Sequence, residues 1–278
     1  VPAVPKQERH VNETMLPTVH AEAGSVPGTS GALKTLCETL AGAATRADFV
    51  ATCRRIVEAS TDVQLNPDAL ETLIPGVAAA QPVSWSWYVR PGTPSLHEAA
   101  FDLVSMAAPN GGYFYPDADG RVRQWAVDGS GAKALQRWSA RLRDAGCLPG
   151  VQLHDPDQVR SAVAPFLAGV PYPDARLQIA AELACPRRRQ RFDQLLDASR
   201  TADGTWLLTL EVADHLAAIY PTAFAEDPFR KKAILALIML HGYLHHAGTP
   251  VVCETPLPAD YQLPRIFHYT GCLEIAPE

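Results

Sequence analysis

The feature that most constrains the fold is the segment of residues 228–246. It follows Asp227 and contains an unbroken apolar stretch from Ala233 to Leu240. Apolar residues over this length predict a long helix, the strongest single element of the chain. The stretch is shorter than the roughly 18 apolar residues that a membrane-spanning helix needs. We therefore expect a helical fold and no membrane span.

Helical spacing of apolar residues recurs along much of the chain. It begins with Leu33 and Leu36 and continues to Val57. Asn66, Pro67 and Asp68 then open a second helix, because proline fits the first turn and an acidic side chain favours the positive end of the helix dipole. Further helices are predicted over residues 131–146, 156–168, 173–184, 188–198 and 206–219.

The middle of the chain has a different pattern. Residues 83–89, VSWSWYV, are dense in aromatic and β-branched side chains, and residues 113–127 contain a turn at 116–120 between two short apolar runs. These patterns predict strands, the second pair as a hairpin. The expected fold is mainly α: one helical domain over residues 31–278, with a β-rich insertion at about 83–128. Residues 1–30 lack periodicity and are expected to form a disordered arm.

Composition limits the ligands. The 278 residues are 47% hydrophobic and 19% charged, enough for one sizeable core or two modest lobes. The net charge is -6, and a protein that grips a nucleic-acid backbone usually carries a basic balance. Intact nucleic acid is therefore not an expected partner. The six cysteines show no metal-site spacing and no apolar leader begins the sequence, which favours a cytoplasmic protein.

The C-terminal stretch resembles a known family. Residues 257–273 read LPADYQLPRIFHYTGCL, which is similar to the Ala-Asp-Tyr-Arg-(Val/Leu)-Pro-Gln run and following helix of queuosine salvage proteins. Upstream, Tyr220-Pro221-Thr222 and residues 229–233, FRKKA, resemble that family's Phe-Pro-Ser segment and Phe-x-Lys-Arg-Ala-Gln helix. Residues 65–67 and 84–88 resemble its Leu-Asn-Pro and Asn-Phe-x-Phe-Trp. The similarity covers roughly residues 45–275, in patches.

The resemblance implies a queuosine salvage fold and hydrolysis of the N-glycosidic bond of queuosine 5'-phosphate, which releases queuine for tRNA modification. Three features depart from the family pattern. Val63 stands where a histidine usually precedes the Leu-Asn-Pro, and Met239 stands where the helix usually carries an acidic residue. The sequence also ends at Glu278, whereas family members continue with further helices.

Asp260 is the predicted catalytic carboxylate. Cleavage of an N-glycosidic bond places positive charge on the sugar, and a carboxylate beside the anomeric carbon stabilises it and orients water. Glu254 could supply a second carboxylate on the same loop. Each acidic residue also has a structural interpretation: Asp260 could cap a helix and Glu254 could be a solvated loop charge.

Aromatic and basic side chains complete the predicted site. Trp85, Trp87, Tyr88 and Tyr261 could hold a planar base by stacking, although large aromatics more often pack in cores. On a strand, Trp85 and Trp87 would share one face and Tyr88 the other. Lys232, with Arg230, could bind a phosphate or form a local salt bridge, for example with Asp227.

His241 and His245 are spaced i, i+4 and share a helix face, with His246 at the neighbouring position, which could suggest a metal site. No third ligand is apparent beside the pair, so no metal and no other cofactor is expected. The basic run at residues 187–191 is expected to be a solvated helix face. The expected partner is a small nucleotide, and the oligomeric state stays open. The alternative function is a catalytically inactive or repurposed nucleotide-binding or interaction module of the same fold.

Overall fold

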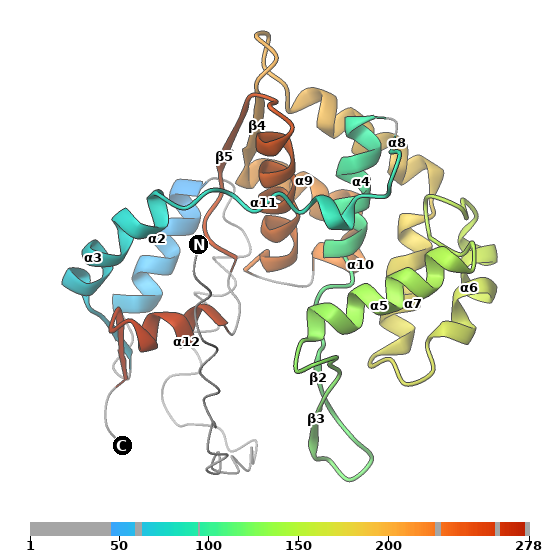
Figure 1. The fold of residues 1–278 in the computed structure, drawn as a ribbon, viewed down its shortest axis with the longest axis horizontal. Coiled ribbons are helices and arrows are strands. Elements are labelled where there is room, and N and C mark those ends of the chain that lie inside the picture. Colours follow the sequence, from blue (N-terminus) through green and yellow to red (C-terminus); the bar gives the residue numbers. More distant parts are fainter. Residues whose placement is uncertain (1–45, 59–62, 94, 226–228, 259–261, 276–278) are drawn as a thin grey trace, which may run out of the picture.

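A computed structural model describes residues 46–58, 63–93, 95–225, 229–258 and 262–275, and within them the fold is mainly helical (Figure 1). The helices are α2 (Arg46–Glu58), α3 (Pro67–Ala78), α4 (Leu96–Ala107), α5 (Gly131–Asp144), α6 (Pro156–Val163), α7 (Pro173–Leu183), α8 (Pro186–Ala198), α9 (Leu210–Ile219), α10 (Pro221–Phe224), α11 (Lys231–His246) and α12 (Gln262–Tyr269), with the 3-10 turns η1 (Ser86–Tyr88) and η2 (Ala164–Phe166). The strands are β1 (Val63–Leu65), β2 (Phe114–Pro116), β3 (Val122–Gln124), β4 (Trp206–Thr209), β5 (Val251–Glu254) and β6 (Leu273–Ile275).

Helix α11 lies at the centre of the larger hydrophobic core. It packs against α4, α9 and β5. The α4 face is rich in small side chains, and Ala99, Ala100 and Ala107 are fully buried. Because alanine keeps two helix backbones close together, this face allows tight contact with the apolar stretch of α11. The long helix predicted from residues 228–246 is confirmed over Lys231–His246.

A smaller hydrophobic core joins α5, α6 and α7. Trp138 of α5 is its largest member, and the indole Nε1 donates a hydrogen bond to the carbonyl oxygen of Phe166, 3.0 Å away. This bond satisfies the one polar atom of a ring that is otherwise surrounded by apolar side chains. The two cores meet at α4 and α7, so the chain forms adjoining helical layers.

A third layer brings segments from the two halves of the chain together. Strands β1 and β6 pair antiparallel, with Val63 opposite Ile275 and Leu65 opposite Leu273. Asn66 follows β1, caps α3 by accepting a hydrogen bond from the Ala69 amide at 3.1 Å, and donates a second bond to Glu274 at 3.1 Å. Helices α2, α3 and α12 surround this ribbon (Figure 1).

Several predictions are confirmed in outline. The structure has the hairpin, as β2 and β3, and the helices over 131–146, 156–168, 173–184 and 188–198, each with slightly different ends. The helix predicted at 206–219 is wrong for its first turn. Residues 206–209 form β4, which pairs parallel with β5, and Thr209 then caps α9.

The strand predicted at residues 83–89 is wrong, and the insertion at about 83–128 is less β-rich than expected. It contains α4, in which Glu98, Asp102 and Ser105 are spaced i, i+4 and i+7 and form a polar stripe on one face, a helical pattern that the sequence prediction overlooked. The arm at residues 1–30 lies outside the described residues. Among the described helices, none has both the length and the apolar character needed to cross a membrane.

Candidate functional site

The segment that was expected to be a strand is a tight aromatic turn. Trp85 has a left-handed backbone conformation, with φ 54°, and residues 86–88 form one 3-10 turn. Positions three apart eclipse in a 3-10 turn. The rings of Trp85 and Tyr88 therefore stack, with centroids 6.0 Å apart and planes 14° from parallel. Trp85 and Tyr88 consequently share a face, and Trp87 is tilted away at 53° to Tyr88.

Helix α11 holds this aromatic turn through a glycine. A Cβ atom on Gly242 would lie 1.9 Å from the Val83 carbonyl oxygen and 3.0 Å from the Trp85 ring. Only glycine allows the strand-like segment before the turn to approach the helix so closely. One helical turn later, His246 hydrogen-bonds the carbonyl oxygen of Pro82 at 2.6 Å. Both contacts fix where Trp85 and Tyr88 point.

Trp85 and Tyr88 form one wall of a cavity of about 420 Å³ between α5 and α11, which we name the α5–α11 cavity. Such a volume suits a nucleoside-sized ligand. Its other walls are the end of α4, the start of the hairpin region, the first turn of α5 and one face of α11. Their lining residues are Met106, Asn110, Tyr113, Gly129, Ser130, Gly131, Ala132, Leu135, Lys231, Leu235 and Met239.

Polar groups gather at one end of the α5–α11 cavity. The Lys231 Nζ atom donates to the Asn110 side chain at 3.4 Å. Ser130 caps α5, and its hydroxyl accepts a hydrogen bond from the Lys133 amide at 3.3 Å. The first turn of a helix carries partial positive charge. A lysine and a helix N-terminus therefore face the same space, which favours an anionic group on the ligand.

Asn110 is positioned by a buried arginine. The Arg176 guanidinium donates to the carbonyl oxygens of Pro109 at 2.7 Å, Gly111 at 2.9 Å and Pro171 at 2.9 Å. It also lies over the Trp125 ring, 4.7 Å from the centroid. Burial lowers the pKa of Arg176 to about 10, so the side chain remains charged near neutral pH. This one side chain fixes the backbone on both sides of Asn110.

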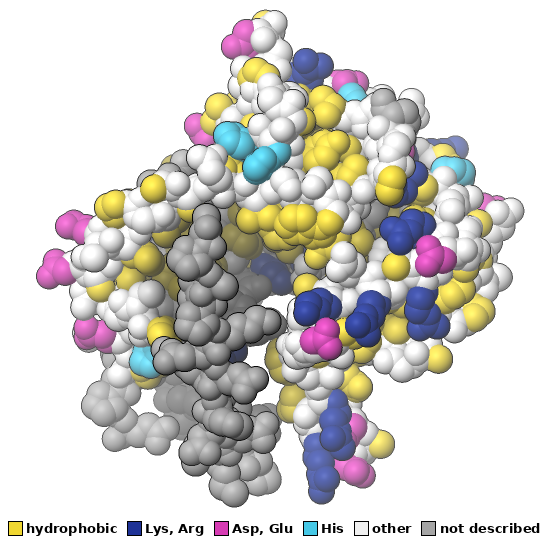
Figure 2. All heavy atoms as spheres, viewed as in Figure 1, with side chains coloured by type: hydrophobic (Ala, Val, Ile, Leu, Met, Phe, Trp, Pro, Cys, Tyr) yellow, Lys and Arg dark blue, Asp and Glu magenta, His cyan; other side chains and the backbone are white. Residues whose placement is uncertain are grey.

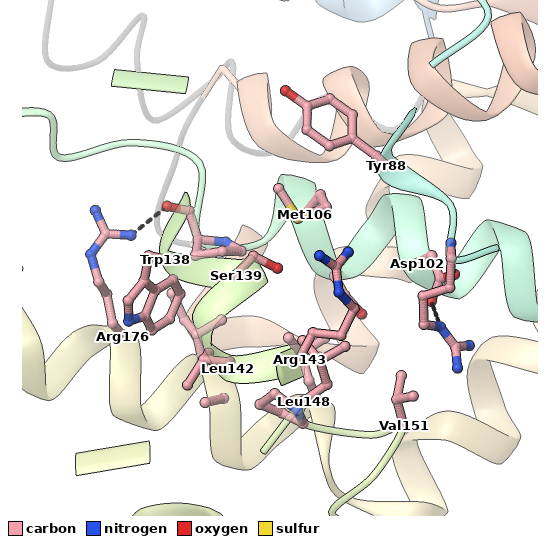
Figure 3. Close-up of a pocket in the computed structure, with 17 residues that line it drawn as sticks. Tyr88, Asp102, Met106, Trp138, Ser139, Leu142, Arg143, Leu148, Val151 and Arg176 are labelled. Carbon is pink, nitrogen blue, oxygen red and sulfur yellow. Dashed lines mark hydrogen bonds and ion pairs between the residues drawn. The ribbon is translucent and has the colours of Figure 1, made fainter. Parts of the chain in front are cut away.

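A second, smaller cavity lies behind Tyr88 (Figure 3). Its volume is about 70 Å³, too small for a nucleotide. The Arg90–Asp102 ion pair, 2.7 Å between Nε and Oδ1, lies on its wall. Burial raises the pKa of the Asp102 carboxyl, against the lowering effect of hydrogen bonds from Arg90. We regard the larger α5–α11 cavity as the candidate site because it combines a nucleoside-sized volume with stacked aromatic rings and a lysine.

The predicted substrate-binding residues do not all meet at this site. Trp85 and Tyr88 line the α5–α11 cavity, whereas Trp87 lines a different groove. The Lys232 Nζ atom lies 3.3 Å from the carbonyl oxygen of Ala108 at the end of α4. Glu254 is exposed at the end of β5, opposite Thr209. Asp260, Tyr261 and Asp227 lie outside the described residues.

Two positions that depart from the family pattern have clear places in the fold. Met239 lies on the α11 face that carries Leu235, one turn away, and Lys231, two turns away, and lines the cavity with them. Val63 begins β1 and pairs with Ile275. Met239 thus makes the cavity wall apolar at this position.

Sequence reasoning missed the polar end of the cavity. Lys231, Asn110 and Ser130 were not singled out, although the Asp128-Gly129-Ser130-Gly131 run before a helix is a readable capping signal. It also missed the roles of the basic run at 187–191. Arg188 donates to the Ile219 carbonyl oxygen and Arg189 pairs with Glu98 and Asp193, so these two side chains are structural and not merely solvated.

The three histidines lie side by side at the end of α11. The rings of His241 and His245 are 6.1 Å apart, and those of His245 and His246 are 5.6 Å apart. Burial and the neighbouring His245 both lower the pKa of His241. In the part of the chain that the structure describes, no group of three or more histidine, cysteine, aspartate or glutamate side chains could hold a metal ion.

Comparison with known proteins gives no family for the chain: no family model matches it, and no curated protein matches it.

Proposed function

We propose that the chain hydrolyses the N-glycosidic bond of a 7-deazaguanine nucleotide such as queuosine 5'-phosphate and releases queuine or a related base. The observation that carries the proposal is the α5–α11 cavity, where stacked aromatic rings and the Lys231 ammonium line one space of nucleoside size. The likeness of residues 257–273 to queuosine salvage proteins supports the choice of base.

Asp260 is the proposed catalytic carboxylate. In sequence it stands between β5 and α12, and its role comes from the resemblance. As the glycosidic bond breaks, its electron pair goes to the ring nitrogen of the base and positive charge develops on the sugar. The carboxylate stabilises that charge and accepts a proton from the attacking water. The water oxygen bonds to the anomeric carbon, and the base nitrogen takes up a proton.

The remaining predicted residues have binding roles in this proposal. Trp85 and Tyr88 hold the planar base by stacking, and Tyr261, beside Asp260 in sequence, adds a further aromatic side chain. The 5'-phosphate binds toward Lys231 and the first turn of α5, where positive charge gathers. Lys232 assists from the next position of α11 by supporting the end of α4.

A base-release assay tests the proposal. Queuosine 5'-phosphate is incubated with the wild-type chain, Asp260→Asn and the control Asp157→Asn, whose carboxylate is exposed on α6. We expect base release by the wild type and by the control, and a loss of at least about 100-fold in kcat for Asp260→Asn. Equal turnover by all three proteins would exclude Asp260 from the reaction.

The apolar Met239 side chain favours a second candidate function, a nucleotide-binding module without catalysis. The described lining residues of the cavity offer stacking and anion binding but no carboxylate. Calorimetric titration with queuosine 5'-phosphate separates the two functions. Heat of binding without any free base in the cell supports the binding module, whereas accumulating base supports the hydrolase.

A further inference from the structure

A second groove lies beside the α5–α11 cavity, and Tyr88 and Met106 line both hollows. Trp87 and Tyr88 form one side of this Trp87 groove, and Gln136, Arg137, Ala140 and Arg143 of α5 form the other. Arg137, Ala140 and Arg143 are three residues apart, and Gln136 lies four before Ala140, so these positions fall on one side of the helix. The groove has a volume of about 270 Å³. Trp87 and the α5 side chains of the groove have no role in the proposed hydrolase reaction.

The aromatic side of the groove is unusually open. The Trp87 side chain is 53% exposed, although a tryptophan ring is normally well buried. Its neighbours Trp85 and Tyr88 hold it, with ring centroids 5.7 and 5.9 Å away. The ring is therefore fixed in orientation while its face remains accessible. An exposed, pre-oriented indole is a suitable platform for a planar ring, since every nucleobase has a face that can stack.

The helical side of the groove is cationic. Arg137 forms no hydrogen bond or ion pair with any residue that the structure describes. Arg143 has only a long contact to its neighbour Asp144, 3.5 Å between Nε and Oδ1. The described lining residues include two arginines and no carboxylate. Figure 2 shows basic side chains gathered on this face of the molecule. In a chain of net charge -6, a local positive groove selects an anion.

We propose that the Trp87 groove binds a planar aromatic anion of the mononucleotide type. Its ring stacks on Trp87, and its phosphate pairs with Arg137 and Arg143. Guanidinium groups form paired hydrogen bonds to phosphate oxygens, which suits arginine better than lysine for this contact. Because Tyr88 lines both hollows, an occupied groove restrains one wall of the α5–α11 cavity and couples the second ligand to the first.

Fluorine NMR on the full chain labelled with 5-fluorotryptophan tests the proposal. The chain has five tryptophans, and Trp87→Phe and Trp85→Phe assign the two resonances of interest. The probe is adenosine 5'-monophosphate, with adenosine and inorganic phosphate as separate arms. We expect a saturable shift of the Trp87 resonance with the nucleotide. Affinity measured at that resonance should fall about tenfold for adenosine, which lacks the anionic group.

Arg137→Ala should weaken nucleotide binding at the Trp87 resonance about tenfold, and Arg137→Lys should recover part of the loss. Arg141→Ala is the matched control, because Arg141 is on the same helix but lies over Phe166, 5.6 Å from the ring centroid. A shift of the Trp85 resonance alone would assign the nucleotide to the α5–α11 cavity and overturn the proposal. So would an unmoved Trp87 resonance, or equal affinity in Arg137→Ala and wild type. Base release is measured separately, so the hydrolase proposal can fail independently.

Discussion

Trp85 and Tyr88 stack on one another although their sequence spacing would place them on opposite faces of a strand. The left-handed conformation of Trp85 starts a 3-10 turn that brings position 88 over position 85. The same turn sends Trp87 into a separate groove. Residues 85–88 therefore line both the α5–α11 cavity and the Trp87 groove. The contact of this segment with α11 sets the position of the wall that it forms in each.

Gly242→Ala should destabilise the chain by about 1–3 kcal/mol, because the added methyl group would overlap the Val83 carbonyl oxygen. Gly76→Ala is the matched control: Gly76 also lies in a helix, and its Cβ would meet nothing within 4 Å. That substitution should stabilise the chain by about 0.5–1 kcal/mol through helix propensity. Urea unfolding measures both changes. Shifts of the same sign in the two variants would contradict the close contact at Gly242.

Lys231→Ala should weaken binding of queuosine 5'-phosphate at least about tenfold and leave binding of unphosphorylated queuosine nearly unchanged. The reason is that Lys231 lines the polar end of the cavity. Lys232→Ala is the comparison at the next position: its ammonium group is directed toward the Ala108 carbonyl oxygen, so any loss of affinity should be equal for the two ligands. Calorimetry with the two ligands measures the difference. A similar loss for both ligands in Lys231→Ala would argue against a phosphate contact.

Arg176→Lys should cost on the order of 3 kcal/mol of stability. A lysine ammonium cannot replace a planar guanidinium that reaches three carbonyl oxygens, and some of these buried acceptors would lose their donors. Arg160→Lys, at an exposed arginine of α6, should change stability by less than about 0.5 kcal/mol. Denaturant unfolding compares them. Equal stability would mean that the Asn110 segment does not depend on Arg176.

His241 should make stability pH-dependent. Its pKa is lowered in the folded chain from the usual 6.5, so below that pH the unfolded chain binds more protons. The free energy of unfolding is therefore fully retained above about pH 6.5 and falls as the pH drops toward the folded pKa. His241→Gln should reduce this fall, while the two proteins should respond alike between about pH 7.5 and 8.5. Unfolding curves at several pH values measure it, and parallel pH profiles would rule out the effect.

The helical part of the fold could be read from the sequence because its signals are local. Asn66 before Pro67 marks a helix start, and the structure has that cap. Glycine after the helix of residues 131–144 marks its end, and Gly146 has φ 72°. Such caps depend on hydrogen bonds among a few neighbouring residues, so they can be predicted without knowing which helices pack together.

The site could be read only in part because it depends on contacts between distant segments. The turn at residues 85–88 has strand-like composition, and only its approach to Gly242 on α11 selects the tighter conformation. Choosing Lys231 over Lys232 requires knowing which face of α11 meets the cavity, since neighbouring helix positions differ by about 100°. Helix α4, by contrast, has the local signals of a helix, with Ser95 as its cap and a polar stripe at Glu98 and Asp102, and could have been predicted.

The β1–β6 ribbon carries a consequence for biosynthesis. Its strands join positions as much as 212 residues apart, since Val63 pairs with Ile275. On the ribosome, the partner of β1 emerges only after α3 through α11 have been made. The layer of α2, α3 and α12 must therefore assemble after translation of the central helices, and such long loops close slowly. We expect chains released early to show folded central helices with this outer layer still open to proteases.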